Sequence, residues 1–300
     1  MINLAPIVLF TYNRLWHTQQ TVEALQRNQL AGESKLFIFS DSPKTEKDEA
    51  KVKEVREYLK DIKGFKKIEI IERDRNLGLA ANIIDGVTRI VNEYGTIIVL
   101  EDDLVTSPYF LTYMNKALEM YRDEEKVASI HGYVYPLPNP EKLPETFFIR
   151  GADCWGWATW KRAWQYFEPD GRKLLALLKE RKESSLFDFN GSYPYTRMLK
   201  NQVKGKNNSW AIRWYASAFV NNMLTLYPRK SLVRNIGFDN SGTHCSTTDV
   251  FDVELVNEVI LEKIPVEENK EARKQFEVYL RNTSPFSLRF IWNVIRRRFL

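Results

Sequence analysis

Three consecutive carboxylates, Glu101, Asp102 and Asp103, follow an apolar run in the segment TIIVLEDDLVTSPYF (96–110). The run is typical of a buried strand, and repulsion and desolvation make acids at its end costly unless a cation compensates them. Carboxylate oxygens are ligands that Mg²⁺ and Mn²⁺ prefer, and such an ion could bridge two phosphates of a ligand and neutralise a departing diphosphate. The alternatives are a solvated acidic loop, or an N-cap for a helix that begins near Ser107.

Polar residues also follow two other apolar segments. PIVLFTYNR (6–14) ends with Thr11, Asn13 and Arg14, and LFIFSD (36–41) ends with Asp41. The planar guanidinium of arginine suits phosphate oxygens, and a carboxylate can accept a hydrogen bond from a ring N–H. The alternatives are a surface residue at a helix start for Arg14 and an N-cap for Asp41.

Hydrophobic periodicity predicts the elements that position these residues. Strands are expected at 6–11, 36–41, 67–73 and 96–100, and helices at 15–29, 46–63 and 77–94. This alternation predicts an α/β fold with a mainly parallel, Rossmann-like central sheet and helices on both faces. Ligands of such sheets bind beyond the carboxyl ends of the strands, which is where all three polar segments lie.

The regular alternation of strands and helices ends in the second half of the chain. Helices are expected at 109–122, 172–182, 193–204 and 209–222, and strands at 146–151 and 224–227. We detect neither an internal repeat nor a low-complexity linker. We expect this half to pack against the strand ends of the first half and to complete one cleft.

Composition and charge exclude several classes of protein. Of the 300 residues, 44% are hydrophobic and 28% charged, which is ordinary for a soluble globular protein. The net charge is +5, and residues 281–300 hold five arginines and no acid, so no broad basic face for nucleic acid is expected. Cys154 and Cys245 lack a zinc-binding spacing, which predicts a reduced, cytoplasmic protein. The N-terminus reads as a strand rather than a signal peptide, and no apolar stretch approaches the roughly 20 residues that cross a bilayer.

The sequence resembles glycosyltransferases of the GT-A fold, the nucleotide-diphospho-sugar transferases. The segments PIVLFTYNR, FSDSPK, NLGLAANIIDGV and TIIVLEDDLVTSPYF occur in the order and spacing of that family, and EDD resembles its metal-binding DxD signature. The likeness is to family 2-like enzymes and to the N-acetylglucosaminyltransferase I group with its bacterial relatives. It continues through GWATWKRAW, which resembles a GLGWML segment, and more faintly to SLVRNIGFDNSGTHC (231–245). It covers roughly residues 5–245.

The resemblance implies a role for each polar strand end. Asp103 would bind the metal directly, Asp102 would lie near the ribose, and Glu101 would face the donor sugar. Arg14 would meet the nucleotide or its diphosphate, and Asp41 would bond the base, expected to be uracil. The other expected nucleotide-binding residues are Thr11, Asn13, Asn76 and Asn82, of which the last two could instead be helix caps.

Aromatic residues and one histidine extend the expected site. GADCWGWATW (151–160) places three Trp within six residues, and indole faces stack on the apolar faces of sugar rings. We expect Trp155 and Trp157, together with Trp210, to contact the donor or acceptor sugar. As an alternative, Trp157 could share one core face of a helix with Trp160 and Trp164. His244 could complete the metal shell or touch the diphosphate, or be a structural loop residue.

An inverting transferase needs a carboxylate that deprotonates the acceptor hydroxyl. The resemblance implies an Asp beside a Trp after the GLGW-like segment, but the corresponding stretch, KNNSWAIRW, has Asn208 there. Asn cannot act as a general base. The candidates for the catalytic position are therefore Asn208, if the enzyme is impaired, or Asp153 or Asp239 in its place.

The segment SPFSLRFIWNVIRRRFL (284–300) could form a basic amphipathic helix. Its apolar residues can share one helix face with arginines nearby, a pattern typical of helices that lie on anionic membrane surfaces. The alternative is a final helix docked on the domain. We expect residues 285–300 to contact the inner face of the cell membrane.

These observations predict a GT-A domain over 1–245 and a helical extension over 246–300. Within the domain, 1–105 would bind the nucleotide-sugar and 106–245 the acceptor. The expected activity is Mn²⁺- or Mg²⁺-dependent transfer of a hexosyl or N-acetylhexosaminyl group from a UDP-sugar to a surface glycan or lipid-linked oligosaccharide, with inversion. The alternatives are a lapsed glycan-binding or scaffold protein and a sugar nucleotidyltransferase. A sugar nucleotidyltransferase would need a glycine-rich phosphate loop after the first strand, and TYNRLWHT (11–18) contains no glycine.

Overall fold

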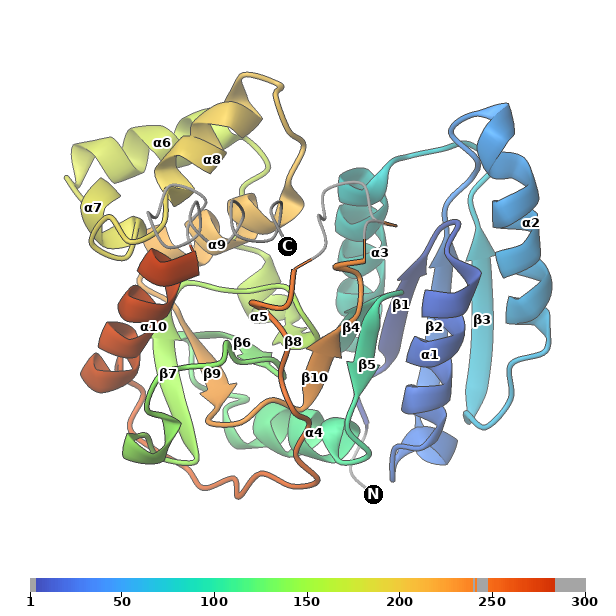
Figure 1. The fold of residues 1–300 in the computed structure, drawn as a ribbon, viewed down its shortest axis with the longest axis horizontal. Coiled ribbons are helices and arrows are strands. Elements are labelled where there is room, and N and C mark those ends of the chain that lie inside the picture. The colour runs from blue at the N-terminus through green and yellow to red at the C-terminus, as the bar shows by residue number, and fades with distance from the viewer. Residues whose placement is uncertain (1–3, 240, 242–247, 284–300) are drawn as a thin grey trace, which may run out of the picture.

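The computed structural model describes residues 4–239, 241 and 248–283. It contains one eight-stranded sheet in the order β3-β2-β1-β4-β8-β6-β9-β7 (Figure 1). The elements of the first half are β1 (Ile7–Thr11), α1 (Leu15–Gln26), η1 (Ala31–Glu33), β2 (Lys35–Ser40), α2 (Glu46–Lys60), β3 (Lys67–Glu72), α3 (Leu79–Tyr94) and β4 (Thr96–Glu101). The strands β3, β2, β1 and β4 are parallel, and the predicted fold class is confirmed.

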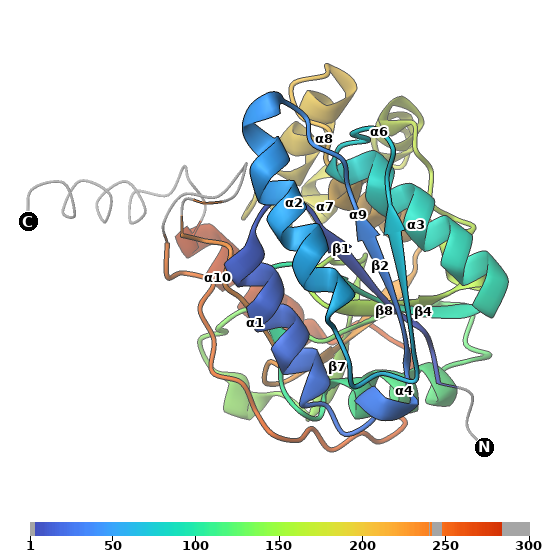
Figure 2. The ribbon, with the colours of Figure 1, turned by 90° about the vertical axis from the view of Figure 1, so that its right-hand side faces the viewer.

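Helices cover both faces of this parallel half, as Figure 2 shows: α1 and α2 lie on one face and α3 on the other. Their apolar faces explain the arrangement. In α3, Ile83, Val87, Ile90 and Val91 repeat at helical spacing and are fully or almost fully buried. The strands β1 and β4 between the two helix layers are apolar except for Thr11, Thr96 and Glu101 at their ends, as expected for a sheet that is covered on both sides.

The second half adds antiparallel pairing and a group of helices. Its elements are β5 (Leu104–Thr106), α4 (Phe110–Met120), β6 (Val127–His131), η2 (Pro140–Lys142), β7 (Thr146–Arg150), β8 (Trp157–Trp160), α5 (Lys161–Trp164), α6 (Gly171–Glu180), α7 (Ser184–Phe187), α8 (Tyr195–Val203), α9 (Trp210–Val220), β9 (Leu224–Pro228), β10 (Val233–Asn235) and α10 (Lys270–Thr283). β8 runs antiparallel to β4 and β6 and thereby joins the two halves into one sheet. None of the helices in the described part of the chain is long and apolar enough to span a membrane.

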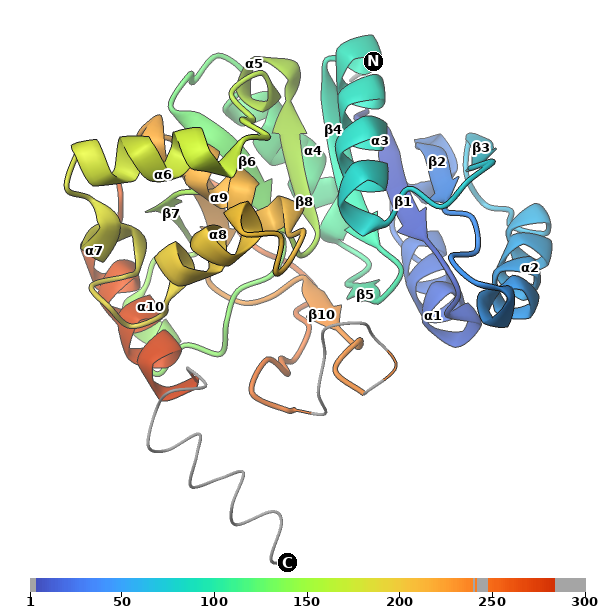
Figure 3. The same cartoon turned by 90° about the horizontal axis from the view of Figure 1, so that it is seen from above.

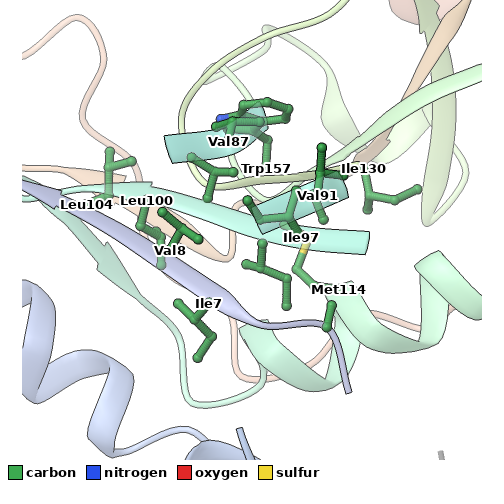
Figure 4. Packing of buried hydrophobic residues seen from close by; sticks show 14 of the residues in the cluster. Ile7, Val8, Val87, Val91, Ile97, Leu100, Leu104, Met114, Ile130 and Trp157 are labelled. Carbon is green, nitrogen blue, oxygen red and sulfur yellow. The ribbon is translucent and has the colours of Figure 1, made fainter. Parts of the chain in front are cut away.

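The segment 157–164 does not form a single helix, although the spacing of its Trp residues is compatible with one. Residues 157–160 form β8, whose ladders with β4 and β6 hold the backbone extended, and only residues 161–164 are helical. Trp157 is therefore a central-strand residue and lies in the main core with Val87, Val91 and Ile97 (Figure 4).

A second core joins α10 to the helices of the second half. Phe276 and Leu280 of α10 pack with residues such as Phe187 and Phe219, and Val259 belongs to the main core. Residues 248–283 thus contact the domain over much of their length. The division at residue 245 stays a prediction about how the chain is organised.

Candidate active site

The carboxyl ends of β1, β2 and β4 lie at one edge of the sheet. The register pairs Thr11 with Ser40 and Phe10 with Glu101, so the three polar segments that follow these strands begin at the same level. This edge is where parallel sheets bind ligands. The structure therefore brings Arg14, Asp41 and the acidic triplet to one side of the molecule.

Arg14 is the cation that compensates the acidic triplet. Its Nη2 donates to Asp102 and, at 2.8 Å, to Oδ2 of Asp103. Burial lowers the pKa of Arg14, but the two carboxylates more than offset this and raise it above its ordinary value. The sequence predicted that such a cation was needed but did not identify Arg14 as this partner.

The acids themselves are harder to ionise than usual. Burial, followed by the charges of Asp103 and Asp102, raises the pKa of Glu101 to about 8. Burial also raises the pKa of Asp102 to about 6, because the attraction of Arg14 offsets it only in part. Near neutral pH Glu101 is therefore mostly protonated, whereas Asp102 is mostly ionised.

A loop far along the chain closes over Asp103. β10 pairs with β5 just after the triplet, and Ile236 N donates to the Asp103 carbonyl at 2.9 Å (Figure 3). A Cβ on Gly237 would lie 2.2 Å from Asp103 Oδ2 and 3.2 Å from Arg14 Nη1, so glycine allows this approach. Sequence reasoning missed Gly237, although it lies inside the segment 231–245 that carried the fainter part of the resemblance.

Asp239 follows in the same loop and pairs with His17 of α1. The His17 Nε2 and Asp239 Oδ2 atoms are 3.1 Å apart, and Ser241 donates to the other oxygen of Asp239. The hydrogen bonds from Ser241 lower the pKa of Asp239. His17 had no role in the sequence predictions, and His244 lies outside the described residues.

Asp41 has structural contacts that the sequence did not indicate. Its Oδ1 accepts from the backbone of Ser42 and Leu77, and its Oδ2 accepts from Gly78 N and Asn76 Nδ2. The three bonds from residues 76–78 tie the end of β2 to the start of α3. They occupy the oxygens that were predicted to bond a base, so base binding by Asp41 would require one of these bonds to open.

The remaining nucleotide-binding candidates divide into two groups. Thr11 is buried and its Oγ1 has no partner among the described residues, so it could bond a ligand at the strand end. Asn13 donates to Asp48 at 3.0 Å, and Asn82 accepts from Arg73 at 2.9 Å. The described contacts of Asn13 and Asn82 therefore engage protein groups.

Two of the three tryptophans expected in the site belong to the core, which corrects those predictions. Trp157 is 0% exposed and Trp210 is 3% exposed, and their ring centroids are 5.6 Å apart. Trp157 also contacts Trp164 and Trp214, and the burial of both rings leaves no exposed face for a sugar. Trp155 is only partly buried, and its ring contacts Phe238 and Phe251 near the loop that holds Gly237.

Asp153 lines an aromatic pocket beside the acidic triplet. Its Oδ2 accepts from the hydroxyls of Tyr135 at 3.2 Å and Tyr227 at 3.4 Å. Burial raises the pKa of Cys154, as do the nearby charges of Asp153, Glu101 and Asp103. Cys154 therefore lies within electrostatic reach of both the pocket and the triplet.

Asn208 does not reach this region. It is exposed just before α9, and its Oδ1 accepts from Arg213 at 3.3 Å. The structure thus brings Asp153 near the triplet and leaves Asn208 outside the pocket. The hydrogen bond between Asn208 and Arg213 is consistent with a structural role for Asn208 at the start of α9.

His131 supports the loop that carries Asp153, a role that sequence reasoning missed. The imidazole is fully buried, its Nδ1–H donates to Tyr133 O at 2.6 Å, and its Nε2 accepts from Trp155 N–H at 3.0 Å. These two bonds define a neutral ring with the proton on Nδ1, and burial lowers its pKa. His131 thereby fixes the backbone beside Asp153.

The triplet could hold a divalent cation only with help from a ligand. Among the residues that the structure describes, no group of three His, Cys, Asp or Glu side chains could hold a metal ion. Asp103 nevertheless offers a carboxylate that already pairs with one cation, Arg14. Mg²⁺ is commonly held by one or two carboxylates together with the phosphates of a substrate, and this donor set fits that pattern.

A family model identifies the kind of domain in this chain. A family model described as Glycosyl transferase family 2 matches residues 7–174, more than half of the chain. No curated protein sequence matches. Solved structures that are similar include S. aureus TarS, at 11% identity and a TM-score of 0.31, over 43% of this chain and 21% of that one. A TarS 1-349 structure matches at 11% identity and a TM-score of 0.35, over 60% of this chain and 49% of that one.

A third similar structure is the mannosyltransferase PcManGT from Pyrobaculum calidifontis, described as a complex with GDP-Man and Mn²⁺. It matches at 11% identity and a TM-score of 0.30, over 47% of this chain and 40% of that one. In all three cases the match spans less than half of the other protein's length.

Proposed function

The chain belongs to glycosyl transferase family 2, and we propose that it transfers a hexosyl or N-acetylhexosaminyl group from a UDP-sugar to a glycan or lipid-linked oligosaccharide. The observation that carries this proposal is the acidic triplet at the carboxyl end of β4, paired with Arg14 and closed by Gly237. A largely buried carboxylate cluster that pairs with an arginine, at the ligand-binding edge of a parallel sheet, suits a diphosphate with its counter-ion.

Arg14 would exchange its carboxylate partners for the diphosphate of the donor. In the free protein the guanidinium of Arg14 is held by Asp102 and Asp103, and both carboxylates are largely buried. A planar guanidinium binds phosphate oxygens as readily as carboxylate oxygens. Arg14 could therefore bind the donor phosphates, and Asp103 would then be free to hold a divalent cation.

Mn²⁺ or Mg²⁺, held by Asp103 and the donor phosphates, would neutralise the charge on the leaving diphosphate. The protein's own contribution is to keep Asp103 in place. Ile236 bonds the Asp103 backbone, and Gly237 leaves just enough room for its side chain. Thr11, with its unpartnered hydroxyl, would bond the nucleotide at the end of β1.

The acceptor would enter from the side of the second half, where Asp153 and Trp155 lie near the triplet. Direct displacement with inversion requires a base on the face opposite the leaving group. Asp153 and Asp239 are the two carboxylates that can be tested for this role. Asp153 sits among tyrosines, and Asp239 is paired with His17.

Calorimetry with UDP and Mn²⁺, together with donor turnover, tests the proposal. We expect the wild-type chain to bind UDP only in the presence of the cation, and Asp103→Asn to weaken this binding at least tenfold. Asp61→Asn on the exposed end of α2 is the matched control and should bind as the wild type does. Unchanged metal-dependent binding in Asp103→Asn would refute the proposed donor site. UDP binding without any transfer or donor hydrolysis would favour a lapsed enzyme.

Contact with a membrane is a separate part of the proposal. The basic and apolar residues of 285–300, which lie outside the described residues, would bring the enzyme to the cytoplasmic face of the membrane. A lipid-linked acceptor is presented there. The support for this is the amphipathic sequence pattern alone.

A further inference from the structure

Aromatic rings make up nearly half of the wall of the pocket beside Asp153. The pocket has a volume of ≈ 210 Å³, and nine of its nineteen lining residues are Phe, Tyr or Trp. They come from segments as distant as Tyr135, Tyr195 and Phe276, so the pocket is built by the packing of the second half and α10. A pocket of this size suits one small ring or head group rather than an oligosaccharide.

The charge inside this pocket is negative and has no cationic partner among the described residues. Asp153 accepts hydrogen bonds from Tyr135, Tyr227 and the Cys154 backbone, all of which are neutral donors. Burying a carboxylate costs free energy unless a charge or several hydrogen bonds compensate it. The three neutral bonds hold the anion in place without neutralising it.

The guanidinium that lines the pocket is already neutralised. Arg150 donates through Nη1 and Nη2 to the two carboxylate oxygens of Glu183, at 2.9 and 2.8 Å, and its Nε bonds Phe219 O. Such a bidentate pair leaves no positive charge for a ligand. The neighbouring triplet adds further negative charge, since the Asp103 carboxylate acts on Cys154 at the pocket wall.

A neutral, hydroxyl-rich sugar fits this wall poorly. Three of the five tyrosine hydroxyls that line the pocket, those of Tyr135, Tyr227 and Tyr215, donate to protein oxygens, which reduces the donors left for the oxygens of a sugar. Polar groups buried without partners weaken binding. Aromatic faces around a carboxylate instead attract cations, and most strongly those that shed little hydration, such as organic ammonium ions.

We propose that this pocket binds an organic ammonium group carried by the acceptor, either the amine of an amino sugar or a quaternary ammonium head group. That the ammonium group belongs to the acceptor rests on the proposed function, whereas the binding of the cation to the pocket does not. Pairing with an ammonium would engage the Asp153 carboxylate and give it a positioning role. The general base would then be Asp239.

Calorimetric titration of the full chain without donor tests this selectivity. The probes are choline against its uncharged isostere 3,3-dimethyl-1-butanol, and glucosamine at a pH where its amine is protonated against glucose. We expect at least one cation to bind about tenfold or more tighter than its uncharged counterpart. A preference seen only with glucosamine assigns the amino sugar, and one seen only with choline assigns the quaternary head group. Equal affinities within both pairs, tighter binding of the uncharged members, or no binding of any probe would overturn the proposal.

Two variants locate the effect in the pocket. Asp153→Asn keeps the acceptor oxygen for the tyrosines but removes the charge, and should lower cation affinity about tenfold, whereas Asp61→Asn should not. If Asp153→Asn does not fold, Tyr193→Leu removes an aromatic face from the half-buried wall and should weaken cation binding several-fold. Unchanged cation binding in the folded variants would refute the assignment. If the wild-type chain fails to bind UDP but still prefers the cationic probes, the proposed donor site alone would be refuted.

Discussion

Gly237→Ala tests how closely the loop after β10 controls Asp103. The added Cβ would lie 2.2 Å from Asp103 Oδ2, whereas ordinary contacts begin near 3.4 Å, so the two must separate by 3.4 − 2.2 = 1.2 Å. The atom in the way is the end of a side chain, and we expect Asp103 to move rather than the fold to open. The free energy of unfolding should fall by only about 1 kcal/mol, at the low end for overpacking.

The effect on function should be much larger than the effect on stability. A displacement of about 1 Å in a positioned group can cost about a hundredfold in rate, so we expect turnover to fall roughly ten- to a hundredfold. Metal-dependent UDP affinity should fall with it. Thermal unfolding, calorimetry with UDP and Mn²⁺, and steady-state kinetics on the same preparation measure the three quantities.

Gly32→Ala in η1 is the matched control, because a Cβ there would meet nothing within 4 Å. It should leave both stability and turnover unchanged. Wild-type UDP affinity and turnover in Gly237→Ala would refute the reasoning, because Asp103 would then tolerate the displacement. If the fall in the free energy of unfolding equals or exceeds the free energy that corresponds to the fall in turnover, the reasoning would also be refuted. The loop would then affect activity by destabilising the fold.

Three further predictions address the triplet, the core and the tail. The pKa of Glu101 is raised to about 8 in the folded chain from an ordinary 4.5, so its contribution to stability is complete below pH 4.5 and is lost as the pH rises through 8. Glu101→Gln should remove this loss and raise the unfolding free energy at pH 9 by up to about 5 kcal/mol, as thermal unfolding across pH would show; an unaltered pH profile would contradict it. Trp157→Ala should cost about 3–5 kcal/mol because Trp157 is fully buried, while Trp155→Ala should cost clearly less, and chemical denaturation compares the two. Deleting residues 285–300 should reduce binding to anionic liposomes and spare turnover of soluble donor, and equal liposome binding in a flotation assay would exclude the membrane role.

The elements of the first half could be predicted because their signals are local. Continuous apolar strands and helices such as 77–94 carry their periodicity within one stretch of sequence, and the structure places α3 at Leu79–Tyr94. The convergence of the polar strand ends followed from one rule about parallel sheets. Thr11, Asp41 and Glu101 therefore lie at the same edge, as predicted.

What the sequence did not disclose depends on contacts between distant segments. The spacing of Trp157, Trp160 and Trp164 is compatible with a helix, and only pairing with β4 and β6 makes the first two strand residues. The partners of Arg14 lie 88 and 89 positions away, and the close approach of Gly237 depends on the β5–β10 pair. Asp41 illustrates the same limit, because its bonds to residues 76–78 follow from the fold and not from its position after a strand.

The pairing of β5 with β10 has a consequence for the order of events during synthesis. Asp103 leaves the ribosome 134 residues before Gly237, the residue that closes over it (237 − 103). At about 5–20 residues per second, this interval lasts roughly 7–27 s. During that time Arg14 can already pair with Asp102 and Asp103, because all three belong to the early half. The nascent chain would thus carry its acidic triplet neutralised but without the loop that closes over it.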